Sequence, residues 1–225
     1  MNTPSSTPSN ASKNNDYYTN HSLGVKWPFT IYHRPIEQSM LASIEAARTR
    51  SGNRLKVLVF GCGLFHENSL FSKEFELTLV DSDERLRPHL LGQVSGFSKS
   101  KVIISTSAKD LSKELTPESY DLIIAKEVIE HITDMAPYFS VFNRCLRQGG
   151  SLWLSTPNYG AIVLPAIEYT FLEFLARIQG FSRFGIHPNK YARHRLKQEL
   201  KRGGFKQIDV ASTPLWLALV ASCHK

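Results

Sequence analysis

Cysteine is scarce in this 225-residue chain, and its spacing excludes two common uses of the residue. Cys62, Cys145 and Cys223 are an odd number at wide intervals, and no two of them have the close spacing of a zinc ligand pair or of a secreted disulfide framework. Such usage is typical of a reducing compartment, so we expect a cytoplasmic protein.

Long apolar runs are also missing. No stretch of roughly eighteen uninterrupted apolar residues occurs, so we expect no transmembrane segment. Residues 1–16, MNTPSSTPSNASKNND, lack the basic and apolar parts of a signal peptide, and their Ser, Thr, Asn and Pro content predicts a disordered tail.

Acidic residues are few in the C-terminal third, where Glu199 is the only one between Arg177 and Lys206. The net charge of +7 suits an acidic substrate, an anionic membrane surface or a nucleic acid, and charge alone does not choose among them. We interpret the basic stretch as a solvated helix face. We therefore expect a small-molecule substrate and no nucleic acid, while peripheral membrane contact stays open and the oligomeric state is undetermined.

From residue 55 onward, short β-branched runs alternate with helix-like segments. This pattern predicts an α/β fold with a mostly parallel sheet and helices on both faces. The predicted strands are residues 55–60, 76–81, 101–105, 120–125, 151–156, 205–211 and 215–221. Only three residues separate the last two, too few for a helical crossover, so the final strand should be antiparallel to its neighbour.

The remaining segments complete the predicted organisation. We expect a helical cap over residues 17–50 and one ligand-binding domain over residues 51–225. A helix is predicted over residues 134–150, ending on a Gly pair. Residues 158–185 are apolar nearly all round, which indicates an inserted helical lid.

A glycine pair follows the first predicted strand. Gly61, Cys62 and Gly63 form a turn, with a helix expected after it, on which a ligand can lie directly against the backbone. Asp81 ends the next strand, where a carboxylate can accept hydrogen bonds from ribose hydroxyls. A dinucleotide would need a third small residue, and Phe65 stands there instead. S-adenosylmethionine has no phosphate and does not need it.

Four segments in order, VLVFGCGLF, LTLVDSDE, SYDLIIAKEVIEHI and LRQGGSLWLSTPN, resemble class I S-adenosylmethionine-dependent methyltransferases over roughly residues 50–222. EVIEH and LSTPN are most similar to the ubiquinone-biosynthesis O-methyltransferases. The resemblance implies a Rossmann-like seven-stranded sheet with an antiparallel last strand, and S-adenosylmethionine as the cofactor. It implies that the cofactor contacts the residues Gly61, Cys62, Gly63, Asp81, Ser107, Ala108 and Lys126.

Three positions depart from the family's usual pattern. Val59 replaces an acid that helps to hold the cofactor's ammonium group, Phe65 replaces a small residue, and Ser107 replaces an Asp that accepts from the adenine amine. A charged hydrogen bond is worth about 1.5 to 3 kcal/mol, so weaker cofactor binding is expected. Glu67 can supply a charge, but nothing in the sequence positions it.

Glu127, Glu130 and His131 have the ExxEH spacing that the resemblance associates with a divalent metal in the ubiquinone-type enzymes. The motif also occurs in relatives without metal, so a metal site is possible but not favoured. His131 alone is the predicted catalytic residue, because an imidazole can take a proton from an acceptor during methylation.

Three function classes stay open at the level of sequence. The leading hypothesis is methyl transfer to oxygen or nitrogen of a small, lipophilic or aromatic acceptor. The others are a non-catalytic binding protein with a degenerate cofactor site and, with less support, a nicotinamide oxidoreductase.

Overall fold

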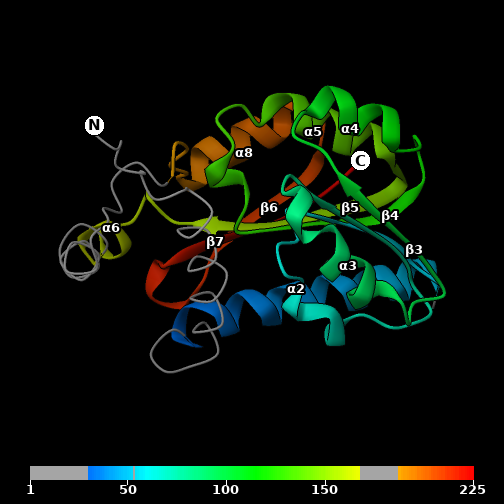
Figure 1. Ribbon diagram of the computed structural model, residues 1–225. Helices are drawn as coiled ribbons and strands as arrows, with labels where there is room; N and C mark the ends of the chain where they lie inside the picture. The colour runs from blue at the N-terminus through cyan, green and yellow to red at the C-terminus, as the bar shows by residue number, and fades with distance from the viewer. Residues whose placement is uncertain (1–29, 53, 168–186) are drawn as a thin grey trace, which may run out of the picture.

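The computed structural model describes residues 30–52, 54–167 and 187–225 (Figure 1). The strands are β1 Lys56–Phe60, β2 Glu76–Asp81, β3 Lys99–Ile104, β4 Tyr120–Lys126, β5 Leu146–Pro157, β6 Lys206–Ser212 and β7 Ala218–His224. The α-helices are α2 Thr30–Ser51, α3 Arg87–Val94, α4 Ala108–Glu114, α5 Ala136–Cys145, α6 Val163–Ile167 and α8 Arg193–Arg202. Short 3-10 helices are η2 His66–Leu70, η3 Glu84–Leu86, η4 Ile129–His131 and η6 Pro214–Trp216.

The sheet has the order β3-β2-β1-β4-β5-β7-β6. Neighbouring strands from β3 to β5 are parallel, whereas β7 is antiparallel to both β5 and β6. Helices α4, α5 and α8 lie on one face of the sheet, and α2 and α3 lie on the other (Figure 1). The predicted fold class, including the antiparallel last strand, is confirmed.

Each sheet face has its own hydrophobic core, which explains the nearly continuous apolar strands. In β4, for example, every residue from Tyr120 to Ala125 is buried. Helix α2 contributes Ile36, Met40, Ile44 and Ala47 at helical spacing to the same core as β1 and β2. The N-terminal helix therefore packs on the sheet.

The expected domain boundaries stay a prediction. Residues 1–16, the first part of the expected cap and residues 168–185 of the expected lid lie outside the described residues. Of the lid, residues 158–167 are described and include the short helix α6. Within the described part of the chain, no helix has the length and hydrophobicity needed to cross a membrane.

The helix expected over residues 134–150 ends early, at Cys145. The Gly pair lies inside β5, where the register against β4 shifts between Tyr120 and Leu122. Gly149 has φ +75°, and a Cβ on Gly150 would meet the Tyr120 carbonyl oxygen at 2.9 Å. The glycines therefore serve a strand irregularity and do not stop the helix.

The helix expected after the glycine turn is the 3-10 helix η2 and not an α-helix. Phe65 precedes it in the left-handed region, at φ 51°, with a side chain only 1% exposed. Its ring packs against Phe71, with 5.3 Å between ring centroids, in the hydrophobic core that contains Val59. Val59 and Phe65, two of the departures from the family pattern, thus belong to one hydrophobic core.

We expect Phe65→Ala to lower the free energy of unfolding by about 3 to 5 kcal/mol, because it removes a fully buried ring. Urea unfolding followed by circular dichroism would measure the loss. Leu91→Ala is the control, since Leu91 is 53% exposed and should change stability by about 0.5 kcal/mol or less. Equal effects of the two substitutions would contradict the anchoring role of Phe65.

Candidate functional site

The glycine turn connects β1 to the carboxyl end of β2. The backbone N–H groups of Gly61 and Cys62 donate to the Val80 carbonyl oxygen at 2.8 and 3.2 Å. A Cβ on Gly61 would lie 2.2 Å from Val128 Cγ2, so the protein's own packing requires this glycine. A Cβ on Gly63 would meet no atom within 4 Å. Gly63 thus borders open space in which a ligand can lie.

Asp81 lies against this turn, as the sequence predicted for a shared site. Its Oδ2 accepts from the Gly63 N–H at 2.8 Å, and its Oδ1 accepts from Ser82 N–H and Asp83 N–H at 2.7 and 3.1 Å. A carboxylate offers about four acceptor positions, so these bonds leave capacity for a ligand hydroxyl. Asp81 orients the turn and stays partly exposed beside it.

Ser107 and Ala108 begin α4, next to the carboxyl end of β3. Ser107 is the N-cap: its Oγ accepts from Asp110 N–H at 3.1 Å and donates to Asp110 Oδ2 at 2.8 Å. Ala108 is buried in the core. The Ser-x-x-Asp spacing is a helix-capping signal that is visible in the sequence itself. The Ser107 side chain therefore has a structural partner where the family pattern has an adenine contact.

A hollow lies beside these residues, lined by Ile104, Ser105, Thr106 and Asp110 among others. Ser105 N–H donates to the Asp81 carbonyl oxygen at 2.9 Å, which ties this segment to the end of β2. Asp81 and the expected adenine region are thus adjacent. Together with the open side of Gly63, this arrangement fits an adenosine-containing cofactor.

Lys126 ends β4, and its side chain pairs with two carboxylates. Lys126 Nζ forms an ion pair with Glu67 in η2 and lies 3.5 Å from Glu37 Oε1 on α2. Burial raises the pKa of Glu67, but the charge of Lys126 and its hydrogen bond lower the pKa more, so Glu67 titrates below its usual range. Nothing in the sequence positions Glu67 beside Lys126, and no pattern in it points to Glu37.

Of the two glutamates in the ExxEH motif, Glu130 is buried and Glu127 is half-buried, and they contact different partners. Glu127 accepts hydrogen bonds from Tyr32 Oη and, at 2.8 Å, from Ser155 Oγ. Glu130, 1% exposed, accepts from Thr156 Oγ1 at 3.0 Å. Burial raises the pKa of both carboxyls, and the charge of Glu127 raises the pKa of Glu130 further.

His131 lies exposed in η4 and faces a histidine from far along the chain. The rings of His131 and His187 are 4.8 Å apart between centroids in an edge-to-face arrangement. His187 Nδ1 shares a hydrogen bond with Tyr159 Oη at 2.5 Å. No spacing pattern in the sequence points to His187. Only the fold brings it to the predicted catalytic residue.

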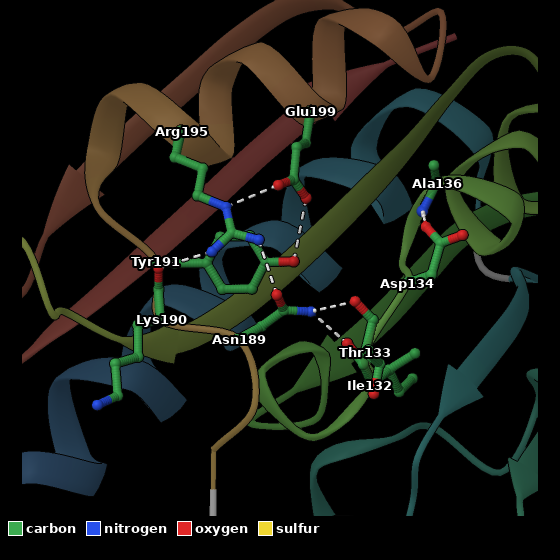
Figure 2. A network of polar contacts seen from close by, with 9 residues as sticks. All are labelled: Ile132, Thr133, Asp134, Ala136, Asn189, Lys190, Tyr191, Arg195 and Glu199. Atoms are coloured by element: carbon green, nitrogen blue, oxygen red, sulfur yellow. Dashed lines mark hydrogen bonds and ion pairs between the residues drawn. The ribbon is translucent and has the colours of Figure 1, made fainter. Parts of the chain in front are cut away.

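A polar network fixes the segment that follows His187 (Figure 2). Asn189 Nδ2 donates to the carbonyl oxygens of Ile132 and, at 3.1 Å, Thr133, just after His131. Arg195 on α8 donates from Nη2 to Asn189 Oδ1 at 2.7 Å and from Nε to Glu199 Oε1 at 2.8 Å. The network ties the start of α8 to the loop after η4, and its contacts lie within two residues in sequence of each histidine.

The ligand set that gathers here differs from the sequence motif. Potential donor atoms of Glu130, His131 and His187 lie within 4.8 Å of one another. Two imidazoles and a carboxylate are donors that transition metals accept. Glu127, the third member of the expected ExxEH set, instead bonds to Tyr32 and Ser155. The motif as written in the sequence therefore does not form a single ligand set.

The raised pKa of Glu130 makes stability depend on pH. Between the usual glutamate value of 4.5 and the raised value, the folded state keeps a proton that the unfolded chain releases, so stability falls as pH rises. Glu130→Gln removes this titration and keeps an acceptor for Thr156. We expect the unfolding free energy of the wild type to fall relative to the variant as the pH rises above about 5, by about 1.4 kcal/mol per unit of pKa difference.

Urea unfolding at several pH values would measure this difference. Glu45→Gln, at an exposed glutamate of α2, is the matched control and should give a curve parallel to that of the wild type. A parallel curve for Glu130→Gln as well would contradict the assignment.

Comparisons with known proteins agree with the geometry. No curated protein matches the sequence. The structure is similar to magnesium protoporphyrin IX methyltransferase from Synechocystis PCC 6803 with bound SAH (TM-score 0.63, 15% identity, 94% of each chain). It is also similar to the N-methyltransferase NodS from Bradyrhizobium japonicum WM9 (TM-score 0.57, 16% identity, 85% of this chain and 97% of that one).

A third similar structure, the CurJ carbon methyltransferase, is longer: the match has a TM-score of 0.57 and 16% identity and covers 76% of this chain and 48% of that one. At these identities the likeness shows the fold. The family model described as a methyltransferase domain matches residues 32–210, most of the chain. With its sheet order and glycine turn, the protein therefore belongs to the class I S-adenosylmethionine-dependent methyltransferases.

Proposed function

We propose that the protein transfers a methyl group from S-adenosylmethionine to oxygen or nitrogen of a small, lipophilic or aromatic acceptor, with His131 as the proton acceptor. The pairing of His131 with His187 carries this proposal. His131 follows the carboxyl end of β4, and His187 contacts Tyr159, two residues after the end of β5. This is the edge where open α/β sheets bind ligands.

Bound S-adenosylmethionine supplies an electrophilic methyl group. The chain must hold donor and acceptor in line, and this alignment accounts for most of the expected acceleration. Gly61, Gly63 and Asp81 would hold the cofactor, while His131 would receive the acceptor's proton as the new bond forms. His187, hydrogen-bonded to Tyr159, limits the positions that the His131 ring can take.

Exposed apolar side chains support a lipophilic acceptor. Ile162 and Val163, 86% and 37% exposed, follow β5, and Leu215 and Trp216, 56% and 62% exposed, lie in η6 before β7. Asn158 Nδ2 donates to the Trp216 carbonyl oxygen at 3.0 Å, so the two segments meet beside Tyr159. Apolar surface next to the histidines suits an acceptor with an apolar body and an ionisable group.

The geometry after the glycine turn does not favour the alternative function, a nicotinamide oxidoreductase. A dinucleotide pyrophosphate binds at the N-terminus of an α-helix, and the 3-10 helix η2 follows the glycines here. The ubiquinone-type branch, suggested by EVIEH and LSTPN, stays a prediction. So do the cytoplasmic location and the lack of a nucleic-acid partner.

Asp81→Ala should weaken binding of S-adenosylhomocysteine by about ten- to a hundredfold, because a charged hydrogen bond to the ribose is worth about 1.5 to 3 kcal/mol. Isothermal titration calorimetry measures the affinity, and Asp209→Ala, at an exposed position of β6, is the control. Unchanged affinity in a folded Asp81→Ala protein would remove this residue from the site.

His131→Ala should lower kcat about ten- to a hundredfold while leaving S-adenosylhomocysteine affinity intact, since the imidazole acts on the acceptor. His187→Ala should lower kcat less, because it acts through the His131 ring. The acceptor is first identified by incubating the protein and labelled methyl donor with cell extract, followed by mass spectrometry of the product. His194→Ala, on exposed α8, is the control.

A cofactor affinity that falls together with kcat in His131→Ala would contradict this role. Failure of the wild type to label any compound in the extract would favour the non-catalytic alternative.

A further inference from the structure

Three charged side chains meet beside the glycine turn: Lys126, Glu67 and Glu37. Lys126 Nζ pairs with Glu67 and lies 3.5 Å from Glu37 Oε1. Two carboxylates thus face one ammonium group, and the trio carries an excess of negative charge. An ion pair that only connected η2 to β4 would need a single carboxylate.

The trio lies at the carboxyl-terminal ends of the parallel strands, where the cofactor is expected to bind. β1 and β4 are parallel neighbours with Val59 opposite Ile124, so the turn after β1 and Lys126 at the end of β4 occupy the same edge. Glu67 follows the turn in η2, and Glu37 comes from α2, which contacts β4. The charges therefore lie at the same edge of the sheet as the glycine turn.

These side chains are partly buried but remain accessible to a ligand. The exposed fractions are 18% for Lys126, 22% for Glu67 and 43% for Glu37. Charges that are partly removed from water interact more strongly than those on an open surface, yet these remain accessible to a small ligand. The low pKa of Glu67, which the charge of Lys126 maintains against burial, keeps its carboxylate ionised at neutral pH.

The carboxyl-terminal edge of the sheet lacks the acidic residue that the family usually has at the position of Val59. Val59, at that acid's position, is 7% exposed and packs in the core with Phe65. A carboxylate there would be buried among apolar side chains. The charge that an ammonium group needs must come from another residue, and Glu67 is the ionised acid nearest in sequence to the turn.

We propose that Lys126 and Glu67, supported by Glu37, bind the amino-acid end of S-adenosylmethionine. The Glu67 carboxylate accepts hydrogen bonds from the α-ammonium group, and Lys126 donates to the α-carboxylate. The two charges are complementary to an amino-acid zwitterion. The excess negative charge also disfavours a phosphate at this position, which separates this ligand from a dinucleotide.

Three adenosine ligands test the two contacts separately by calorimetry. S-adenosylhomocysteine has both charged groups, decarboxylated S-adenosylmethionine keeps only the amine, and 5′-methylthioadenosine has neither. Glu67→Gln should weaken the first two by about ten- to a hundredfold. Lys126→Met should weaken S-adenosylhomocysteine by a similar factor and decarboxylated S-adenosylmethionine by less, because only the first has a carboxylate for Lys126, while the second is affected through the pKa of Glu67, which rises when the Lys126 charge is removed. Neither substitution should change the affinity for 5′-methylthioadenosine.

A charge exchange separates binding from a purely structural role. The triple variant Glu67→Lys, Lys126→Glu and Glu37→Gln retains an ion pair between η2 and β4 with reversed polarity, and Glu37→Gln avoids a repulsion with the new carboxylate at position 126. It should fold, keep its affinity for 5′-methylthioadenosine and lose affinity for S-adenosylhomocysteine. Glu76→Gln with Lys99→Met removes an exposed ion pair at the opposite edge of the sheet and is the matched control.

Two results would overturn the proposal. One is a parallel change in all three affinities, which would mean that the trio only shapes the turn. The other is unchanged S-adenosylhomocysteine affinity in folded single variants or in the charge-exchanged protein. If the wild type bound none of the three ligands, the cofactor assignment itself would fail, and the control titrations distinguish that case.

Discussion

The parallel register of β1 with β2 and β4 is the constraint on which the site depends. It places the glycine turn, Asp81 and Lys126 at one edge, because parallel strands all end at the same side of a sheet. The bond from Gly63 N–H to Asp81 Oδ2 then fixes the turn against β2. A ligand that spans the ends of these strands meets in turn the glycine backbone, the Asp81 carboxylate and the charged trio of Lys126, Glu67 and Glu37.

Hydrophobic packing replaces two features of the usual cofactor loop. Val59 and Phe65 lie in the same core as Phe71, so the segment after the turn is anchored by a buried ring. This anchoring holds η2, and with it Glu67, next to Lys126. The exchange of an acid and a small residue for two apolar ones is therefore consistent with a cofactor site whose charge comes from elsewhere.

The acceptor side is organised by long-range polar contacts. Glu127 and the buried Glu130 accept hydrogen bonds from the hydroxyl groups of Tyr32, Ser155 and Thr156, while His131 faces His187. The network from Asn189 to Arg195 holds the chain after His187 against the loop after His131. Charged and ring groups thus converge at one edge without a contiguous motif.

The sequence by itself determined the sheet, its antiparallel end, the glycine turn and the position of Asp81 at the end of β2. It could do so because strand patterning and turn chemistry are local properties. Tertiary structure alone decided the rest. The spacing of ExxEH did not reveal that Glu127 bonds to Tyr32, and no local pattern linked His131 to His187. Ser107 carried a local capping signal, but Glu67 acquired its partner only when β4 was placed beside β1. Contacts between residues distant in sequence depend on strand order, which short-range patterns do not encode.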